Sequence, residues 1–278
     1  EETRRILDLY TDFAVNEAAV PVVPGLKSKT EKFAGALHSY SIEAMMGDTK
    51  ALQSGTSHNL GQNFAKAFEI QYLDQSNQLQ HCWTTSWGVS TRFIGAIIMT
   101  HGDDQGLILP PRLAPIQIVI VPIFRSDEEF SLVMPVVEQV KAALAGFRVK
   151  VDDRSEVTPG FKYHDWEMRG VPLRLEIGPK DVQNGTVMAA RRDIPGKAGK
   201  TLIQQDQIAA QVSDLLKTIQ ASLLQRATEF RDSNIHVPKD YADLQNIVQN
   251  GWAYAWWCED AACEAKVKED TKATTRCI

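Results

Sequence analysis

The sequence predicts a multidomain chain in which an α+β part is followed by an α/β part. With 278 residues, the chain reaches the size, roughly 250–300 residues, at which a single hydrophobic core stops growing. A proline cluster at Pro110, Pro111 and Pro115 interrupts regular structure and indicates a domain boundary. Before this cluster, helical patterns mix with short strand-like runs, whereas after it strands and helices alternate.

The composition excludes several classes of protein. A hydrophobic fraction of 44% argues against disorder. The longest apolar stretch, residues 116–123, is far shorter than the ~20 residues of a membrane span. Four cysteines in a chain of this length do not make a disulfide framework, so we expect a reducing, cytoplasmic compartment.

Residues 1–113 form the first predicted domain, which mixes helices and strands. It opens with a helical pattern whose predicted apolar face holds Ile6, Leu9, Tyr10 and Phe13. Because the chain starts inside a helix, we expect it to be part of a longer protein.

Residues 114–225 form the second predicted domain. A buried strand at residues 116–121 comes first, and Asp127 is the predicted cap of a helix whose apolar face holds Leu132, Val136, Val137, Val140 and Leu144. The remaining predicted elements are a strand at 147–151, a helix at 159–169, strands at 173–177 and 186–190, and a long helix near 204–230. This alternation predicts a mostly parallel or mixed sheet with helices on its faces.

The third predicted domain, residues 226–278, is small and carries Cys258 and Cys263. A pair of cysteines at this spacing is half of a four-ligand zinc site. Because two cysteines do not make four ligands, we expect no competent metal site in this chain.

The net charge of −5 conceals an uneven distribution of charge. Residues 141–200 hold twelve Lys and Arg against eight Asp and Glu, whereas the blocks on either side are acidic. Two interpretations stay open: a solvated face with scattered charges, or a patch that contacts phosphates. The charge alone does not choose between them.

The densest motif lies at residues 83–99. An aromatic and β-branched strand stops at Gly88, and Ser90 is the predicted N-cap of a helix whose buried face holds Ile94, Ile97 and Ile98. Arg92 then lies in the first helical turn, where a cation is unfavourable beside the positive end of the helix dipole. A bound phosphate would offset this cost, and pairing with a nearby carboxylate is the alternative.

A second motif, residues 53–64, gathers hydroxyl, amide and imidazole groups between Gly55 and Gly61. Polar groups at this density favour the wall of a polar pocket over a plain turn. For His58, a pocket role and a structural role remain equally open.

Several stretches, in matching order, resemble prolyl-tRNA synthetase of the archaeal/eukaryotic type. They are residues 32–36, 55–58, 60–64, 85–92, 101–104, 106–112, 159–162, 166–172 and 177–181. The resemblance covers essentially the whole chain, and the number of linked motifs makes it specific.

The resemblance implies ATP-dependent attachment of L-proline to tRNA(Pro) through a prolyl-adenylate intermediate. Residues 1–113 would form the C-terminal half of the class II antiparallel-sheet catalytic domain, including motif 3, whose arginine holds the γ-phosphate of ATP. The implied catalytic residues are Arg92 and His58. The implied ATP-binding residues are Gln53, Thr56, Ser90 and Arg92, and the implied proline pocket is formed by Phe33, His58, Trp87 and Gly88. Mg²⁺ is implied as a cofactor.

The resemblance also gives the basic block a function, since residues 114–225 would be the anticodon-binding domain. Glu167 would read a base, with backbone or base contacts from Lys162, Arg169, Arg191 and Arg192. Residues 226–278 would be a truncated, zinc-binding-like C-terminal domain of α/β type, with zinc possible in the full-length enzyme.

Class II motifs 1 and 2 would lie before Glu1, so the resemblance predicts that this chain alone is inactive, and that the full enzyme is a homodimer. Two alternatives stay open. One is another class IIa synthetase, such as a threonyl enzyme, and the other is a non-catalytic, synthetase-like RNA-binding accessory protein.

Overall fold

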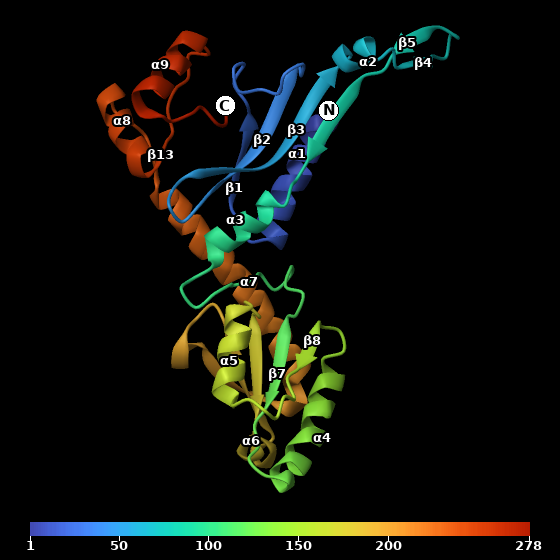
Figure 1. Cartoon of the computed structure of the whole chain (residues 1–278), viewed down its shortest axis with the longest axis vertical. Helices are drawn as coiled ribbons and strands as arrows, with labels where there is room; N and C mark the ends of the chain where they lie inside the picture. The colour runs from blue at the N-terminus through green and yellow to red at the C-terminus, as the bar shows by residue number, and fades with distance from the viewer. The chain divides into compact units, whose positions relative to one another are not determined.

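The computed structural model describes residues 1–278 and divides into two compact units (Figure 1). Unit 1 comprises Glu1–Asn16, Val20–Thr100 and Ala227–Ile278, and unit 2 comprises Glu17–Ala19 and His101–Arg226. The predicted third domain therefore falls within unit 1, together with most of the first, and the three-part division stays a prediction. None of the helices is both long and apolar enough to cross a membrane.

Unit 1 is built on a four-stranded antiparallel sheet. Its strands, in spatial order, are β1 (Val22–Leu26), β2 (His38–Met45), β3 (Ala51–Gly61) and β6 (Thr84–Gly88). Helix α1 (Glu2–Asp12) packs along the sheet, where the Ser57 hydroxyl of β3 donates to the carbonyl of Thr3 at 2.9 Å. One face of β2 and β3 is thus covered by a helix, and the other face is where the polar residues gather.

The predicted helix at the N-terminus is confirmed, but its predicted apolar face is partly wrong. Ile6 is buried as expected, together with Leu7 and Thr3, whereas Leu9 is 57% exposed and Phe13 is 38% exposed. The face that meets the sheet therefore includes Thr3, a polar residue that an apolar pattern does not reveal.

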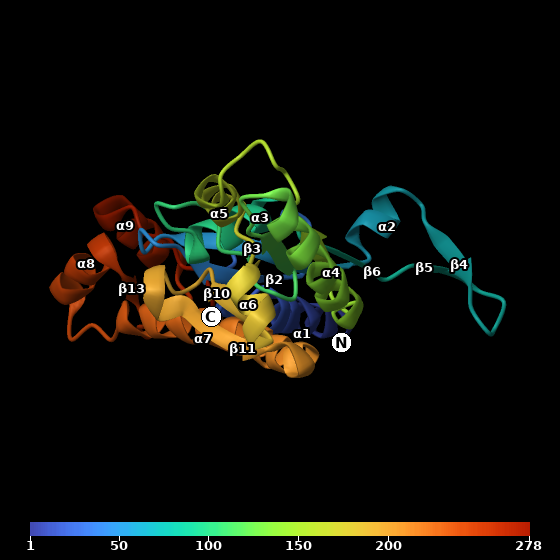
Figure 2. The ribbon, with the colours of Figure 1, turned by 90° about the horizontal axis from the view of Figure 1, so that it is seen from below.

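The remaining elements of unit 1 surround this sheet or extend from it. They are the π-helical turn at Phe13–Glu17, α2 (Asn63–Ala67), a hairpin of β4 (Gln71–Leu73) and β5 (Leu79–His81), α3 (Arg92–His101), β12 (Ile235–His236), α8 (Tyr241–Asn250), β13 (Trp252–Ala253) and α9 (Ala261–Thr271). The hairpin projects away from the sheet, as both views show (Figure 1 and Figure 2). The C-terminal elements are joined to the sheet region by a hydrogen bond from the Trp252 indole to the carbonyl of Thr49 at 2.8 Å.

Helix α3 begins as predicted, but it buries a different face. The backbone N–H of Arg92 donates to Ser90 Oγ at 3.3 Å, which fits the predicted cap. Phe93 and Ala96 are the buried residues, whereas Ile94 is 59% exposed and Ile98 is 43% exposed. The prediction of Ile94 and Ile98 as buried was wrong, because the helix packs on the side of Phe93, whose ring lies 5.7 Å from that of Phe13.

Unit 2 contains a five-stranded mixed sheet, which confirms the predicted α/β architecture. Its order is β11 (Lys200–Gln204), β10 (Thr186–Arg191), β9 (Leu173–Ile177), β7 (Ile118–Pro122) and β8 (Val149–Val151). Strand β7 pairs in parallel with β8 and β9, whereas β10 pairs antiparallel with β9 and β11. The helices are α4 (Asp127–Ala143), α5 (Pro159–Met168), α6 (Pro179–Asn184) and α7 (Ile208–Ser233), with 3-10 turns at Gly196–Gly199 and Gln205–Gln207.

Helix α4 differs from its prediction at two positions. Ser126, and not Asp127, is the N-cap, since its Oγ accepts from the N–H of Glu129 at 3.2 Å. Val133 is fully buried, whereas Leu132 is 43% exposed. The shift of the cap by one residue is the usual uncertainty of a helix end. The buried face includes Val133 in place of Leu132, and Val137, Val140 and Leu144 are buried as predicted.

Candidate functional site

Three polar side chains of β2 lie opposite three predicted site residues of β3. Ser39, Ser41 and Glu43 recur at every second residue, so they share one face of the sheet, and all three are fully buried. Their cross-strand partners are His58, Thr56 and Gln53, in that order. The register therefore brings the predicted nucleotide residues and the predicted proline-pocket histidine into one row.

An irregularity in the β2–β3 pairing makes this row possible. Gln53 and Thr56 are three residues apart, so in a regular strand their side chains would point to opposite faces. The register shifts between Ile42 and Glu43, which leaves Ser54 as an extra residue in β3. Such a bulge re-aims the residues beside it, and here it places Gln53 opposite Glu43, on the same face as Thr56.

Strand β6 extends the row on its other side. Gly88 pairs with Thr56 and Ser86 pairs with His58, so both lie beside the predicted site residues. Trp87 pairs with Ser57 instead, whose hydroxyl faces α1, and the Trp87 side chain is 49% exposed. The strand therefore does not bring Trp87 to the face that carries His58.

The surroundings of His58 fix both its charge and its orientation. Ser39 Oγ lies 2.8 Å from Nδ1 of His58 and accepts from the backbone N–H of Phe33 at 2.9 Å. Burial lowers the pKa of His58, and the nearby ammonium of Lys27 lowers it further. The hydrogen bond to Ser39 holds the imidazole ring in place, and its direction follows the tautomer of the ring.

The ring of Phe33 lies 5.0 Å from that of His58, centroid to centroid. Phe33 is 48% exposed, so one side of this aromatic pair remains accessible. The structure thus brings together the two predicted pocket residues Phe33 and His58 and adds the buried hydroxyl of Ser39. An apolar face beside an imidazole whose pKa is lowered suits a small, largely apolar ligand with one polar group.

Lys27 and Glu43 are site residues that the sequence interpretation missed. The Lys27 ammonium donates to Gln53 Oε1 at 2.8 Å. The Glu43 carboxylate accepts from Ser41 Oγ at 2.8 Å and lies 3.4 Å from the guanidinium of Arg276. For Glu43, the sequence contained a signal: Ser39, Ser41 and Glu43 recur at every second position of one strand.

Burial raises the pKa of Glu43, and the hydrogen bond from Ser41 and the charges of Arg276, Lys27 and Arg92 oppose this effect. Arg92 is therefore electrostatically linked to the buried carboxylate. It is exposed and makes no ion pair within 4.0 Å. The sequence offered two partners for Arg92, a bound phosphate or a nearby carboxylate. The structure contains no ion pair between Arg92 and a carboxylate.

The two cysteines of the predicted half zinc site lie together but without further ligands. Cys258 and Cys263 are both free and exposed, and a side-chain hydrogen bond between them, followed by desolvation, raises the pKa of Cys263. Groups of three or more His, Cys, Asp or Glu that could hold a metal ion do not occur in the chain.

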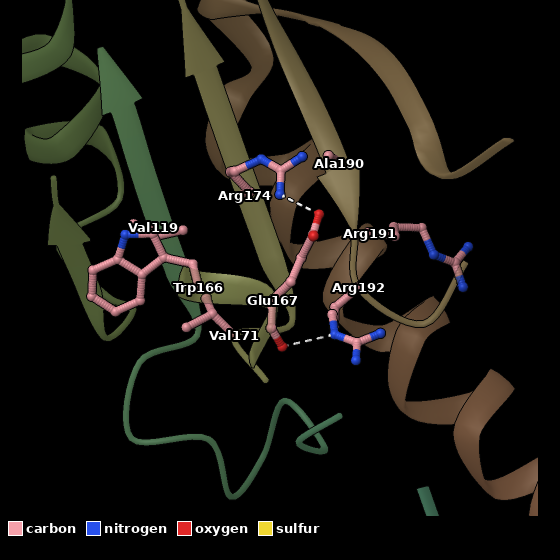
Figure 3. A pocket seen from close by; sticks show the side chains of 8 residues that line it. All are labelled: Val119, Trp166, Glu167, Val171, Arg174, Ala190, Arg191 and Arg192. Carbon is pink, nitrogen blue, oxygen red and sulfur yellow. Dashed lines mark hydrogen bonds and ion pairs between the residues drawn. The ribbon is translucent and has the colours of Figure 1, made fainter. Parts of the chain in front are cut away.

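In unit 2, the predicted base reader Glu167 lies in a small hollow between α5 and the ends of β9 and β10 (Figure 3). The hollow is lined by Val119, Trp166, Glu167, Val171, Arg174, Ala190, Arg191 and Arg192. This lining combines one carboxylate with three guanidinium groups, so it suits the polar edge of a larger ligand.

The five predicted tRNA-binding residues differ in accessibility. Arg169 is exposed, with its guanidinium over the Trp166 ring and bonded to Asp165. Glu167 is half-buried, and Arg191 is paired with the buried Asp193 at 2.6 Å. Two other predicted residues, Lys162 and Arg192, are buried.

Both buried cations have structural partners. Lys162 donates to the carbonyl of Asp152 at 3.1 Å, and its desolvation lowers the pKa of the ammonium. Arg192 forms two bonds to the Asp103 carboxylate and one to the carbonyl of Glu167. These contacts favour a supporting role for Lys162 and Arg192, and leave Glu167, Arg169 and Arg191 as the candidate RNA contacts.

Comparisons with known proteins identify the domains and the family of the chain. Residues 117–222 match the family model described as "Anticodon binding domain", and residues 241–278 match "Prolyl-tRNA synthetase, C-terminal". A proline–tRNA ligase of Chloroflexus aurantiacus is 57% identical over 280 residues, covering 100% of this chain. The chain belongs to the prolyl-tRNA synthetase family.

Other members of the family show how much of the protein is present. A chloroplastic/mitochondrial proline–tRNA ligase of Arabidopsis thaliana is 53% identical and covers 100% of this chain, which spans 52% of that protein. The crystal structure of a Cryptosporidium parvum prolyl-tRNA synthetase complexed with L-proline and AMP has a TM-score of 0.89, at 38% identity. The match covers 98% of this chain and 58% of the Cryptosporidium parvum chain. The chain thus spans little more than half the length of these family members.

Proposed function

We propose that the protein of which this chain forms a part attaches L-proline to tRNA(Pro) in an ATP-dependent reaction through a prolyl-adenylate. The observation that supports this proposal most strongly is the row of site residues on β3. Gln53, Thr56 and His58 share one face of a sheet in a chain that belongs to the prolyl-tRNA synthetase family. Relatives named proline–tRNA ligase and a neighbour complexed with L-proline and AMP support the proposal.

In this reaction the residues of unit 1 bind and orient. The Phe33 ring and the neutral His58 border the proline, with Gly88 beside them, and Gln53, Thr56 and Ser90 contact the nucleotide. Arg92, at the start of α3, holds the γ-phosphate. Formation of the adenylate joins a carboxylate to the α-phosphate and releases pyrophosphate, so oriented charge contributes more than a protein nucleophile would.

In unit 2, Glu167 reads an anticodon base while Arg169 and Arg191 contact the backbone or the bases. A carboxylate accepts from base amino groups, and guanidinium groups bind phosphate. The match of residues 117–222 to an anticodon-binding domain supports this assignment.

Mg²⁺ enters this proposal with the phosphates of ATP, since the chain offers no cluster of three metal-binding side chains. A magnesium ion bound mainly by substrate phosphates needs only one or two carboxylates from the protein. We further propose that the full enzyme is a homodimer and works in the cytoplasm, where it meets its tRNA, and that zinc binds only if further ligands join Cys258 and Cys263.

Amino-acid-dependent exchange between ATP and pyrophosphate tests the proposal on the full-length protein. The expected result is exchange with proline but not with threonine, and no exchange by residues 1–278 alone. Exchange with threonine instead of proline would favour another class IIa synthetase. A full-length protein without any exchange that still binds tRNA would favour a non-catalytic RNA-binding protein.

A further inference from the structure

The guanidinium of Arg174 lines the hollow in unit 2 and bridges two carboxylates. Arg174 comes from β9 and is 8% exposed. Its Nη1 donates to Glu167 Oε1 at 2.9 Å, and its Nε donates to Glu176 Oε1 at 3.1 Å. One buried cation therefore joins a carboxylate on helix α5 to a carboxylate on strand β9 (Figure 3 shows the contact with Glu167).

Further contacts hold this guanidinium in one plane. It stacks on the ring of Tyr163, 4.0 Å from the ring centroid. Lys200 donates to both oxygens of Glu176 at 2.9 Å, so two cations face two carboxylates in the cluster. A guanidinium that is stacked on one side and bonded at two ends has little freedom to turn.

Glu167, in contrast, is placed to meet a ligand. Its side chain is 25% exposed, and only Oε1 is bonded to Arg174. Its other oxygen, Oε2, lies 3.2 Å from Nδ1 of His164, a side chain that is 85% exposed. The buried guanidinium thus fixes one carboxylate oxygen, while the second lies on the accessible side.

We propose that Arg174 is a positioning residue for base selection: it orients the Glu167 carboxylate toward an RNA base and makes no contact with RNA itself. The inference rests on the proposed function of unit 2. A carboxylate held in one orientation accepts from the exocyclic amino group of a base. Uracil has no amino group, and its one ring donor, N3–H, lies at a different position on the edge of the base. Without Arg174, the same carboxylate rotates among several orientations and loses this selectivity.

A lysine cannot take over the role proposed for Arg174. Lysine carries one compact charge on a flexible stem and cannot bond to two carboxylates in a fixed fork geometry. Arg174→Lys keeps the charge balance of the cluster but releases Glu167, whereas Arg174→Gln removes the charge as well. Both variants are expected to lose selectivity.

The test measures the dissociation constants of the chain, residues 1–278, for tRNA(Pro) transcripts with the natural anticodon and with single uridine replacements. The variants are Arg174→Gln, Arg174→Lys, Glu167→Gln, and Glu167→Gln combined with each Arg174 variant. Arg148→Gln is the matched control, because Arg148 is also an anchored guanidinium of unit 2, bonded to the carbonyls of Pro111, Arg112 and Ala114.

At the base read by Glu167, the wild-type chain is expected to prefer the natural transcript, and each Arg174 variant to lose about tenfold of that preference. The loss should disappear in the Glu167→Gln background, because Arg174 acts through Glu167. Arg148→Gln should keep the preference. If Arg174→Gln does not fold, as judged by circular dichroism, Arg174→Lys decides.

Three outcomes overturn the inference alone. The first is a preference that both Arg174 variants retain, the second is a loss of preference that adds to that of Glu167→Gln, and the third is a loss that Arg148→Gln shares. A wild-type chain that binds tRNA(Pro) without any preference among anticodons would overturn the proposed function of unit 2, and the inference with it.

Discussion

The hydroxyl of Ser39 lies 2.8 Å from Nδ1 of His58, so a buried serine on β2 orients an imidazole on β3. The same oxygen accepts from the N–H of Phe33, and the rings of Phe33 and His58 lie 5.0 Å apart. One side chain therefore holds both residues that border the proposed proline pocket.

Replacing Ser39 by alanine should weaken proline binding. The change leaves the N–H of Phe33 and Nδ1 of His58 without their partner, at a cost of about 1–3 kcal/mol. In the full-length enzyme we expect the KM for proline to rise about tenfold, with a smaller change in the KM for ATP. Ser57→Ala is the control, since Ser57 is equally buried but bonds to Thr3 on the other face. Equal effects of both changes on proline would contradict the assignment.

Replacing Arg92 by glutamine should impair formation of the adenylate. Because the guanidinium has no protein carboxylate as partner, its proposed role is to stabilise phosphate charge. Loss of one such preorganised group typically costs about 10²–10³ in rate. Proline-dependent ATP–pyrophosphate exchange measures this loss, and Arg5→Gln, at an exposed pair with Glu2, serves as the control. Unchanged exchange in Arg92→Gln would disprove the role.

Replacing Glu167 by alanine should affect tRNA alone. We expect the KM for tRNA(Pro) to rise about tenfold, as for loss of one base contact, while adenylate formation stays unchanged. Glu138→Ala provides a control, because Glu138 is an exposed residue of the same unit and pairs only with Lys141. An equal loss in adenylate formation and in tRNA charging would rule out a role limited to RNA.

His101 should make the stability of unit 2 depend on pH. Burial lowers the pKa of His101 to about 4; its Nε2 lies 3.1 Å from the carbonyl of Ala18, and Nδ1 has no hydrogen-bond partner. Below pH ~6.5 the unfolded chain takes up a proton that the folded chain refuses until about pH 4. The free energy of unfolding should therefore fall as the pH falls through this window, by about 3 kcal/mol in full.

Urea denaturation at a series of pH values between 7 and 4.5, followed in wild type and His101→Gln, checks this prediction. Glutamine keeps a donor for the carbonyl of Ala18 but does not titrate, so the variant should show a flatter dependence on pH. Parallel curves for the two proteins would show that other groups cause the slope.

Gly106 should tolerate no side chain. Its φ is +128°, and a Cβ at this position would lie 2.5 Å from the backbone Cα of Met168. Gly106→Ala should therefore destabilise unit 2 by about 2–4 kcal/mol, from backbone strain and steric conflict together. Thermal unfolding measures the effect. Gly146→Ala, which meets no atom within 4 Å, should change stability by less than about 1 kcal/mol.

The sequence was sufficient to predict the mixed sheet of unit 2, because strands such as Ile118–Pro122 are continuous apolar runs that follow a proline cluster. It also located the start of α3, since Ser90 is a strong capping residue. The buried faces of α1 and α3 were harder to predict. Leu9, Ile94 and Ile98 fit an apolar pattern, but which side of a helix is covered depends on the position of neighbouring elements.

The candidate site residues also divide into those that the sequence located and those whose surroundings it did not reveal. Phe33 and His58 were named from short motifs, and the structure joins them through Ser39. Lys162 and Arg192 were named from their charge, yet both are bonded inside unit 2. Charge in a sequence does not distinguish a surface cation from a buried one, because burial depends on long-range partners such as Asp103.

The extra residue in β3 has a consequence for engineering and for comparing sequences. Deleting Ser54 alone would leave Gln53 and Thr56 two residues apart, so a regular strand would still carry both side chains on one face. Deleting both Ser54 and Gly55 would make Gln53 and Thr56 neighbours and turn Gln53 toward α1. Among active relatives, the loss of one residue between Gln53 and Thr56 should therefore be tolerated more often than the loss of two.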